Sequence, residues 1–320
     1  MIARPEISVT IATYNRRDMI ERAIRSVLRQ TIKSLEILII DDGSTDGTEI
    51  LIEHLQKEDS RIRYFKRHHS GTVAVPINYG IMQSTGKYVT FHASDDESEP
   101  TWLEEQLDIF KRPGGENIDI SSCNILVVDS ETKNKEEVSK PQNTDNEYIL
   151  RTSLVHNYIF GNLVVRQGFF QKVGMYDESI KIREDFDMWV RLLEAGYKFD
   201  FVYKPLYITY KHKGQSSHID FYNNSKIAEY LLAKHRKIYE RYPKEHSEAI
   251  RVCGVLQLLA GNHLEARKSF LRAIKTYPWC FRAYFNYLST FIGKSAVALL
   301  FAFRQKVFIS SKTIKEKIFS

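Results

Sequence analysis

The feature that most constrains the fold is an alternation, over roughly the first 130 residues, of apolar strand-like runs with segments of helical periodicity. The run at 7–15 is followed by apolar residues at the spacing of an amphipathic helix: Ile20, Ala23, Ile24, Val27 and Leu28. Three further runs, at 35–44, 62–67 and 87–94, are each followed by another helical segment. This order predicts an α/β fold with a doubly wound, mostly parallel sheet.

The residues at the carboxyl ends of these strands are the first place to look for chemistry, because open parallel sheets bind ligands there. They are Thr13 to Asn15, Asp41 to Ser44, and Ser94 to Asp96. An aspartate after a strand also forms turns and caps helices without any ligand. From the residues alone, both interpretations stay open for Asp42, Asp95 and Asp96.

A nucleotide-activated sugar suits this set of side chains. Its diphosphate must be neutralised as the sugar leaves, which a divalent cation held by one or two carboxylates can do. Asp95 and Asp96 supply an acidic pair directly after the fourth strand. Asp42 can accept a hydrogen bond from a nucleobase, and Tyr14 can stack on it.

Other phosphate-binding classes fit less well. The spacing from Gly80 to Gly86-Lys87 is one residue too long for a P-loop, and Tyr88 follows instead of Ser or Thr. No G-x-G-x-x-G follows the first strand, where a dinucleotide site requires it. The sequence therefore disfavours P-loop NTPases and nicotinamide enzymes.

Composition adds only limits on the location and partners of the chain. The net charge of +6 does not choose among acidic partners, and we expect no nucleic acid partner. Three separated cysteines indicate neither a disulfide framework nor a zinc site, which fits a reducing cytoplasm. The N-terminus lacks the order of a secretory signal, and the longest apolar run, Ser295 to Phe303, is too short to span a bilayer.

The chain changes character towards its C-terminus. A polar stretch at 131–147 predicts an exposed loop or lid, or a disordered insertion. We expect one domain at 1–220 and a helical region at 221–320, in which the residues from about 247 to 280 have the spacing of a tetratricopeptide repeat. The basic, Phe-containing tail at 294–320 predicts either a peripheral membrane contact or a core-packing helix with a solvated end.

Four segments together resemble the family 2 glycosyltransferases with the GT-A fold, across roughly residues 6 to 215. They are VTIATYNRRDMIERAIRSVLRQT, LEILIIDDGSTDGT, GTVAVPINYGIMQSTGKYVTFHASDD and EDFDMWVRLLEAGYKF, and they occur in the family's order. The resemblance implies a GT-A fold with a C-terminal helical extension, and a divalent metal cofactor, Mn²⁺ or Mg²⁺.

The resemblance also implies roles for residues on the donor side. Thr13, Tyr14 and Asp42 would hold the nucleoside, and Asp95 would lie near the ribose and diphosphate. Asp96 would be the metal ligand, with His212 as a further ligand. Ala93 stands where many members of the family have an Asp, so the metal site would have fewer carboxylates.

On the acceptor side, the resemblance assigns Asp185 as the general base, with Glu184 as the second candidate. Such a base removes the proton of the acceptor hydroxyl as it attacks the anomeric carbon. Without the resemblance, two acidic residues at the start of a helix would be read as partners of the helix dipole.

These observations predict an inverting transferase that moves a sugar from a nucleotide diphosphate, most often UDP in this family. The acceptor would be a hydroxyl of a polysaccharide or a lipid-linked oligosaccharide, reached from the cytoplasm or the inner face of the membrane. Two alternatives stay open. One is a sugar nucleotidyltransferase, and the other is a non-catalytic scaffold whose helical region binds a protein partner.

Overall fold

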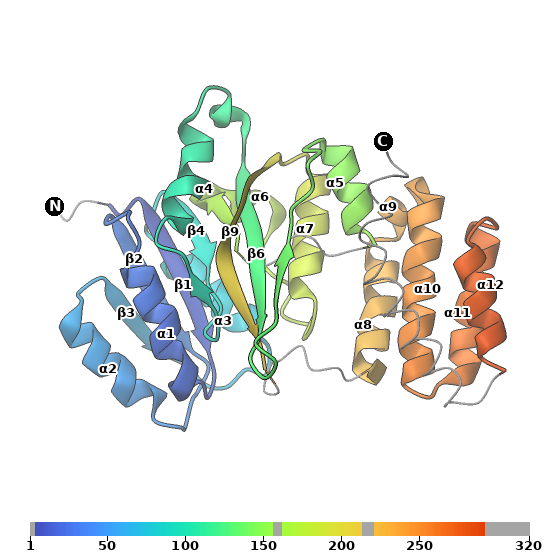
Figure 1. Cartoon of the computed structure of the whole chain (residues 1–320), viewed down its shortest axis with the longest axis horizontal. Helices are drawn as coiled ribbons and strands as arrows, with labels where there is room; N and C mark the ends of the chain where they lie inside the picture. Colours follow the sequence, from blue (N-terminus) through green and yellow to red (C-terminus); the bar gives the residue numbers. More distant parts are fainter. Residues whose placement is uncertain (1–3, 156–161, 213–220, 292–320) are drawn as a thin grey trace. The chain divides into compact units, whose positions relative to one another are not determined.

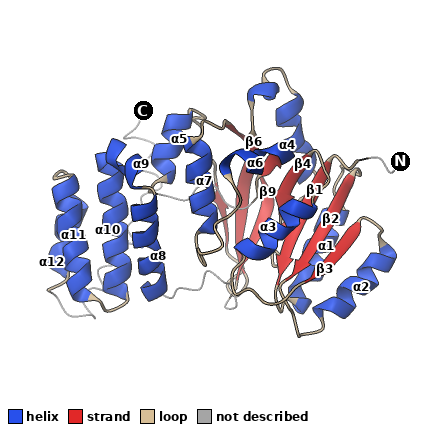
Figure 2. Cartoon of the chain, turned by 180° about the vertical axis from the view of Figure 1, so that it is seen from behind, coloured by secondary structure: helices blue, strands red, loops and turns tan. Residues whose placement is uncertain are grey.

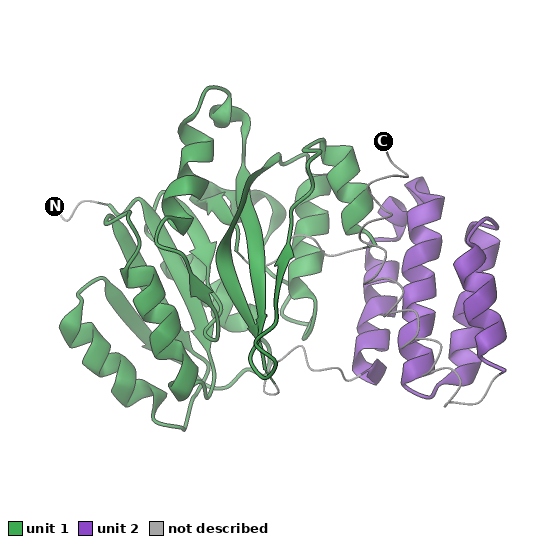
Figure 3. Cartoon of the chain, in the orientation of Figure 1, with its two compact units in different colours: residues 1–218 green, residues 219–320 purple. Residues whose placement is uncertain are grey.

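The computed structural model describes residues 4–155, 162–212 and 221–291. The chain separates into two compact units, residues 1–218 and residues 219–320 (Figure 3). Each unit has its own fold and is described by itself.

The described part of the first unit is built on a nine-stranded sheet (Figure 1). The strand order is β3-β2-β1-β4-β8-β6-β9-β5, and β7 pairs with β6. The strands are β1 (Ile7–Thr13), β2 (Leu35–Asp41), β3 (Ile62–Lys66), β4 (Tyr88–Phe91), β5 (Glu97–Ser98), β6 (Ile120–Asp129), β7 (Lys135–Val138), β8 (Val164–Arg166) and β9 (Phe199–Lys211).

The strands predicted from the first 130 residues form the parallel half of this sheet. β1 pairs in parallel with both β2 and β4, and β2 pairs in parallel with β3. β6 and β9 are parallel to each other, whereas β8 joins β4 and β6 in antiparallel pairs. The predicted α/β architecture is confirmed, with antiparallel pairings added on the C-terminal side.

Helices cover both faces of the sheet. α1 and α2 lie against one face of β1 to β3, and α3 lies against the other (Figures 1 and 2). The spacing predicted for α1 is confirmed, since Ile20, Ala23, Ile24 and Val27 are all buried. The helices of this unit are α1 (Arg17–Leu28), α2 (Thr48–Glu58), α3 (Ala74–Gln83), α4 (Trp102–Lys111), α5 (Asn146–Ser153), α6 (Phe170–Val173) and α7 (Glu184–Glu194).

The prediction for residues 131–147 was wrong in part. Residues 135–138 form β7, which is antiparallel to β6, and α5 begins at Asn146 after Asp145 accepts a hydrogen bond from the Tyr148 amide. The strand was missed because its charged residues, KEEV, show no apolar alternation. Such residues suit an exposed strand at the edge of a sheet.

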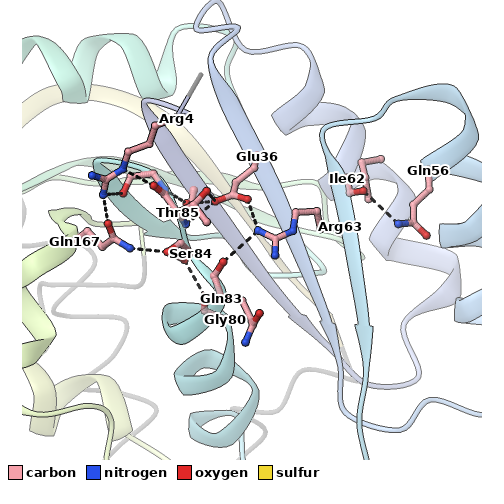
Figure 4. A network of polar contacts seen from close by, with 12 residues as sticks. Arg4, Glu36, Gln56, Ile62, Arg63, Gly80, Gln83, Ser84, Thr85 and Gln167 are labelled. Carbon is pink, nitrogen blue, oxygen red and sulfur yellow. Dashed lines mark hydrogen bonds and ion pairs between the residues drawn. The ribbon is translucent and has the colours of Figure 1, made fainter. Parts of the chain in front are cut away.

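A polar network stabilises the amino end of the parallel strands, opposite the predicted site (Figure 4). The buried carboxylate of Glu36, near the start of β2, accepts hydrogen bonds from Ser8 Oγ, from Thr85 N and from Arg63 Nη1. Gly86 is required beside it, because a Cβ there would lie 2.6 Å from the Ser8 amide nitrogen. The polar groups at this end of the sheet are therefore used to stabilise the fold. The predicted ligand-binding residues lie at the opposite, carboxyl end.

The described part of the second unit is helical, as predicted. It contains α8 (Phe221–Lys234), α9 (Arg236–Arg241), α10 (Pro243–Leu259), α11 (His263–Thr276) and α12 (Phe281–Ser289). α10 and α11 pack closely at Gly254, where a Cβ would come within 2.7 Å of the buried Phe270 ring. The predicted basic tail at 294–320 lies outside the described residues. Among the helices described, none has the length and apolarity needed to cross a bilayer.

Candidate active site

The ends of β1 and β2 place a threonine hydroxyl beside an aspartate. Thr13 pairs with Asp41 in the parallel register, and the backbone N–H of Asp42 donates to the Thr13 carbonyl at 2.9 Å. Thr13 Oγ1 is buried and has no hydrogen-bond partner among the described residues. Because a buried hydroxyl is costly without a partner, this atom is a candidate contact for a bound ligand.

The Asp42 carboxylate is held by the loop that follows β3. It accepts hydrogen bonds from Ser70 N at 3.0 Å and from Ser70 Oγ at 3.1 Å, and His69 Nδ1 lies 2.8 Å from Asp42 Oδ2. The Asp42 side chain is only 6% exposed. The structure thus ties β2 to this loop, and Ser70 was not among the predicted site residues.

Tyr14 presents an aromatic face at the same place. Its ring stacks on His69, with 3.8 Å between the ring centroids and 15° between the planes. The residue is nonetheless 42% exposed. The prediction that Tyr14 offers a stacking surface fits this geometry, although in this structure His69 covers one face of the ring.

The second cluster lies between the loop after β4 and the end of β9. His212 Nε2 lies 3.0 Å from Asp95 Oδ2, and Arg16 Nη1 donates to the same carboxylate oxygen at 3.1 Å. Arg22, on α1, donates to the Asp95 backbone carbonyl and lies over the Tyr210 ring at 3.9 Å. Asp95, in the loop after β4, is therefore contacted by Arg16 from the loop after β1, by Arg22 from α1 and by His212 after β9.

Asp96 points in a different direction from Asp95. Its carboxylate accepts hydrogen bonds from Thr209 Oγ1 and from the Tyr210 amide, both at 3.2 Å on β9. Burial, and secondarily the charge of Asp95, raises the pKa of Asp96 to about 7. The structure brings His212 to Asp95 and joins Asp96 to β9, so the two predicted metal ligands, Asp96 and His212, have different partners.

Ala93 is held where a carboxylate was expected by comparison with the family. Its backbone N–H donates a hydrogen bond to the hydroxyl oxygen of Tyr207, on β9, at 2.9 Å. Tyr207 is buried, and burial raises the pKa of its hydroxyl well above the ordinary value. The phenol thus fixes the backbone just before the acidic pair.

The acidic pair Glu184-Asp185 begins α7. Arg183, the residue before the helix, has φ of 66°, and the three acidic residues of the first turn are Glu184, Asp185 and Asp187. Burial, followed by the charge of Asp185, raises the pKa of Glu184 to about 8. The shift disfavours the ionised form of Glu184, which is the form that a general base requires.

Hydrogen bonds join the segment that precedes α7 to α3 and to the loop before α3. The side chain of Asn78, on α3, donates to the Tyr176 carbonyl and accepts from the Tyr176 amide, both at 2.9 Å. Thr72 Oγ1 donates to the Ile180 carbonyl at 3.3 Å. The loop after β3 and the helix α3 that follows it are thus each joined to the segment that precedes α7.

Several residues of the two clusters were not predicted. Arg16 and Arg22 lie inside the first matching segment, which was the available signal for them, and Tyr210 lies two residues before the predicted His212. Ser70 and Tyr207 carry no signal of this kind. They could be found only from the distances in the folded chain.

Asp95 and His212 supply two of the ligands that a divalent cation needs, and the others would have to come from outside the protein. A carboxylate oxygen and an imidazole nitrogen are suitable donors for Mn²⁺, and the two atoms lie close together. Among the described residues there is no group of three or more His, Cys, Asp or Glu side chains that could hold a metal. The remaining ligands would have to be diphosphate oxygens and water, which is the usual arrangement for Mg²⁺ at phosphates.

The chain was compared with known families and structures. The sequence profile of Glycosyl transferase family 2 matches residues 8–174, which contain Thr13, Asp42, Asp95 and Asp96 but not His212. The chain belongs to this family. The family assignment agrees with the resemblance found in the sequence, and the matched residues end before the acidic pair of α7.

Relatives with curated sequences match about 60% of the chain. An uncharacterised glycosyltransferase of Rickettsia typhi is 31% identical over 195 residues, which are 60% of this chain and 60% of the relative. A putative teichuronic acid biosynthesis glycosyltransferase of Bacillus subtilis is 30% identical over 194 residues, covering 61% of this chain and 74% of the relative. The chain thus spans about 60% of the length of the first of these relatives.

Two solved structures share the fold of this family 2 chain. Residues 1–349 of S. aureus TarS, in complex with UDP-GlcNAc, superpose with a TM-score of 0.58 at 17% identity, covering 85% of this chain and 89% of that one. A mannosyltransferase of Pyrobaculum calidifontis, in complex with GDP-Man and Mn²⁺, gives 0.53 at 17% identity, covering 96% and 81%. At these identities the likeness supports the GT-A fold alone.

Proposed function

We propose that the protein is an inverting, metal-dependent glycosyltransferase that uses a nucleotide-diphosphate sugar. The observation that carries the proposal is the 3.0 Å contact between His212 Nε2 and Asp95 Oδ2 at the carboxyl end of the parallel strands. It brings a carboxylate and an imidazole together at the strand ends, and Thr13 and Tyr14 lie at the end of β1 in the same sheet. This is the end of the sheet at which α/β folds bind ligands.

On the donor side, the nucleoside would lie against Tyr14, with Thr13 Oγ1 and the Asp42 carboxylate as hydrogen-bonding groups. The buried, unpaired Thr13 hydroxyl supports this placement. Asp42 would accept from a base N–H after releasing part of its contact with Ser70. The UDP-GlcNAc complex of TarS supports a UDP sugar as the first donor to test.

At the diphosphate, Asp95 and His212 would hold Mn²⁺ or Mg²⁺, and Arg16 would move from Asp95 towards the phosphates. The cation would neutralise charge that develops on the departing diphosphate. Asp96, held by Thr209 and Tyr210 on β9, would be a second carboxylate beside the metal site. It would compensate for the aspartate that many family members have at position 93, where this chain has Ala93. The Mn²⁺ complex of the P. calidifontis mannosyltransferase supports the choice of metal.

On the acceptor side, Asp185 would take the proton from the attacking hydroxyl. Burial and the charge of Asp185 raise the pKa of the neighbouring Glu184, which disfavours its ionised form and supports Asp185 as the base of the pair. Attack on the face opposite the diphosphate would invert the anomeric carbon. The acceptor class we propose is a hydroxyl of a cell-envelope polysaccharide or lipid-linked glycan, supported by the name of the B. subtilis relative.

The decisive experiment is a panel of UDP and GDP sugars incubated with the full chain, with Mn²⁺, with Mg²⁺ or with EDTA. We expect metal-dependent release of the nucleoside diphosphate, slow with water and faster with an acceptor glycan. Binding of donors without any release would favour the scaffold alternative. Pyrophosphate formed from a nucleoside triphosphate and a sugar phosphate would favour the nucleotidyltransferase alternative.

A further inference from the structure

The last described helix, α12, turns its large apolar side chains outwards. Phe281, Tyr284, Phe285 and Leu288 are 70%, 41%, 50% and 62% exposed. Their spacing of three, one and three residues places them along one stripe of a helix. The opposite face is packed inside the unit and is built from small or polar residues, namely Ala283, Asn286 and Ser289.

The stripe continues beyond both ends of the helix. Trp279 precedes it at 69% exposure, and Phe291 follows it at 59%. The Trp279 and Phe281 rings lie 6.2 Å apart, and a shallow hollow is lined by Pro278, Trp279, Phe281 and Tyr284. We call the six exposed residues the aromatic face: Trp279, Phe281, Tyr284, Phe285, Leu288 and Phe291.

Exposure on this scale calls for a partner. Single exposed apolar residues are common on soluble proteins, but a contiguous group of this size usually marks an interaction surface. Tryptophan and tyrosine have apolar rings with a polar edge, which suits them to the boundary between acyl chains and water. The composition of the aromatic face therefore matches the interface of a bilayer.

The excess of basic residues around this helix favours a negatively charged partner. From Ala266 to Lys315 the sequence contains no Asp or Glu, while it contains ten Lys or Arg. Five of these lie in α11 and α12: Arg267, Lys268, Arg272, Lys275 and Arg282. Basic residues next to an apolar face are attracted to anionic lipid headgroups, and the attraction weakens as salt is added.

We propose that the aromatic face of α12 binds the headgroup region of a membrane that contains anionic phospholipid. The aromatic rings would enter the boundary of the acyl chains, and the basic side chains around them would contact the phosphates. The proposal does not depend on sugar transfer, because it uses none of the residues of the candidate active site. It differs from the predicted contact through the tail at 294–320, because every residue of the aromatic face lies within the described part of the chain.

The tryptophans of the chain make a direct test available. The sequence contains three, and Trp102 and Trp189 are only 0% and 2% exposed, whereas Trp279 is 69% exposed. A change in tryptophan emission on adding vesicles therefore reports mainly on Trp279. We expect a blue shift and protection from acrylamide with vesicles of phosphatidylcholine and phosphatidylglycerol, and little change with phosphatidylcholine alone.

Paired variants distinguish binding through the aromatic face from non-specific hydrophobic adsorption to vesicles. Phe281→Ser combined with Leu288→Ser should lower co-sedimentation with anionic vesicles by about tenfold or more. The matched control is Leu259→Ser combined with Leu264→Ser, which removes apolar residues that are 41% and 64% exposed elsewhere on the same unit. Trp279→Phe should still sediment but should lose the blue shift.

Three outcomes would overturn the proposal. The first is equal sedimentation of both double variants, and the second is equal binding to neutral and anionic vesicles. The third is a Trp279 emission that is already blue and protected from acrylamide before vesicles are added. That result would mean that another part of the chain or a second copy covers the aromatic face, and gel filtration of the full chain would separate these two cases.

Discussion

His212 and Asp95 are 117 positions apart, yet Nε2 of one lies 3.0 Å from Oδ2 of the other. The contact forms because β9 ends beside the loop that follows β4, with Asp96 bonded to Thr209 and Tyr210 in between. Arg16 from the loop after β1 completes the group. The relationship makes Asp95 the carboxylate to test first as a metal ligand.

The first prediction concerns the metal. Asp95→Asn and His212→Ala should each raise the Mn²⁺ concentration needed for half-maximal activity by about tenfold or more, equivalent to ~1.4 kcal/mol of binding free energy. Calorimetric titration of Mn²⁺ and UDP gives the same comparison without turnover. Asp108→Asn, at an exposed position on α4, is the control. If Asp96→Asn loses metal dependence while Asp95→Asn keeps it, the ligand is Asp96.

The second prediction concerns the general base. Asp185→Asn should lower the rate of sugar transfer by ~10²–10⁴ while leaving the affinity for the donor nearly unchanged, because the base acts only on the acceptor. Rapid-quench measurement of transfer, with UDP binding followed separately, tests both parts. Full transfer activity in Asp185→Asn would exclude this residue as the base.

The third prediction concerns pH and stability. Because the pKa of Glu184 is about 8 in the folded chain and 4.5 for the free side chain, the folded state binds more protons between these values. The contribution of Glu184 to the stability of the folded state therefore decreases as the pH rises from about 4.5 to 8. Glu184→Gln cannot lose a proton, so it lacks this pH dependence. The melting temperature of the variant minus that of the parent should therefore increase as the pH rises from 5 to 8. Parallel pH curves for the two proteins would contradict the assignment.

The fourth prediction concerns the nucleobase. Tyr14→Ala should weaken UDP binding by about 5- to 150-fold, the range expected for loss of one base–aromatic stack worth ~1–3 kcal/mol. Tyr14→Phe keeps the ring and should bind within about twofold of the parent. Since Tyr14 is 42% exposed, neither change should unfold the protein, which a thermal melt verifies. Unaltered binding by Tyr14→Ala would place the base elsewhere.

The fifth prediction concerns the network at the amino end of the strands. Burial favours the neutral form of Glu36, but hydrogen bonds from Ser8, Thr85 and Arg63 outweigh it and lower the pKa of Glu36. Glu36→Gln should therefore destabilise the fold by ~1–3 kcal/mol at pH 7, and the difference should shrink as the pH falls below about 4.5.

Glu53→Gln, an exposed position on α2, is the matched control for Glu36→Gln. Chemical denaturation gives the free energy of unfolding, and kcat/KM for donor hydrolysis should be unaffected under conditions where the variant is folded. An activity loss without a stability loss would show that this end of the sheet also contributes to catalysis.

The sequence by itself predicted the alternation of strands and helices, because apolar periodicity is a local property that burial imposes on each element. It also identified the strand-end residues Thr13, Asp42 and Asp95, since a parallel sheet brings those ends together whatever the details of packing. The edge strand β7 was missed because its charged residues carry no such period.

Which side chains touch was decided by the tertiary structure. Spacing along the chain cannot show that β9 returns beside β4, so it could not choose between Asp95 and Asp96 as the partner of His212. It also could not show that His69 covers Tyr14, or that burial and the charge of Asp185 raise the pKa of Glu184. Distances across a fold and the burial of charges depend on every packed element at once, whereas strands, helices and their ends depend mainly on neighbours in sequence.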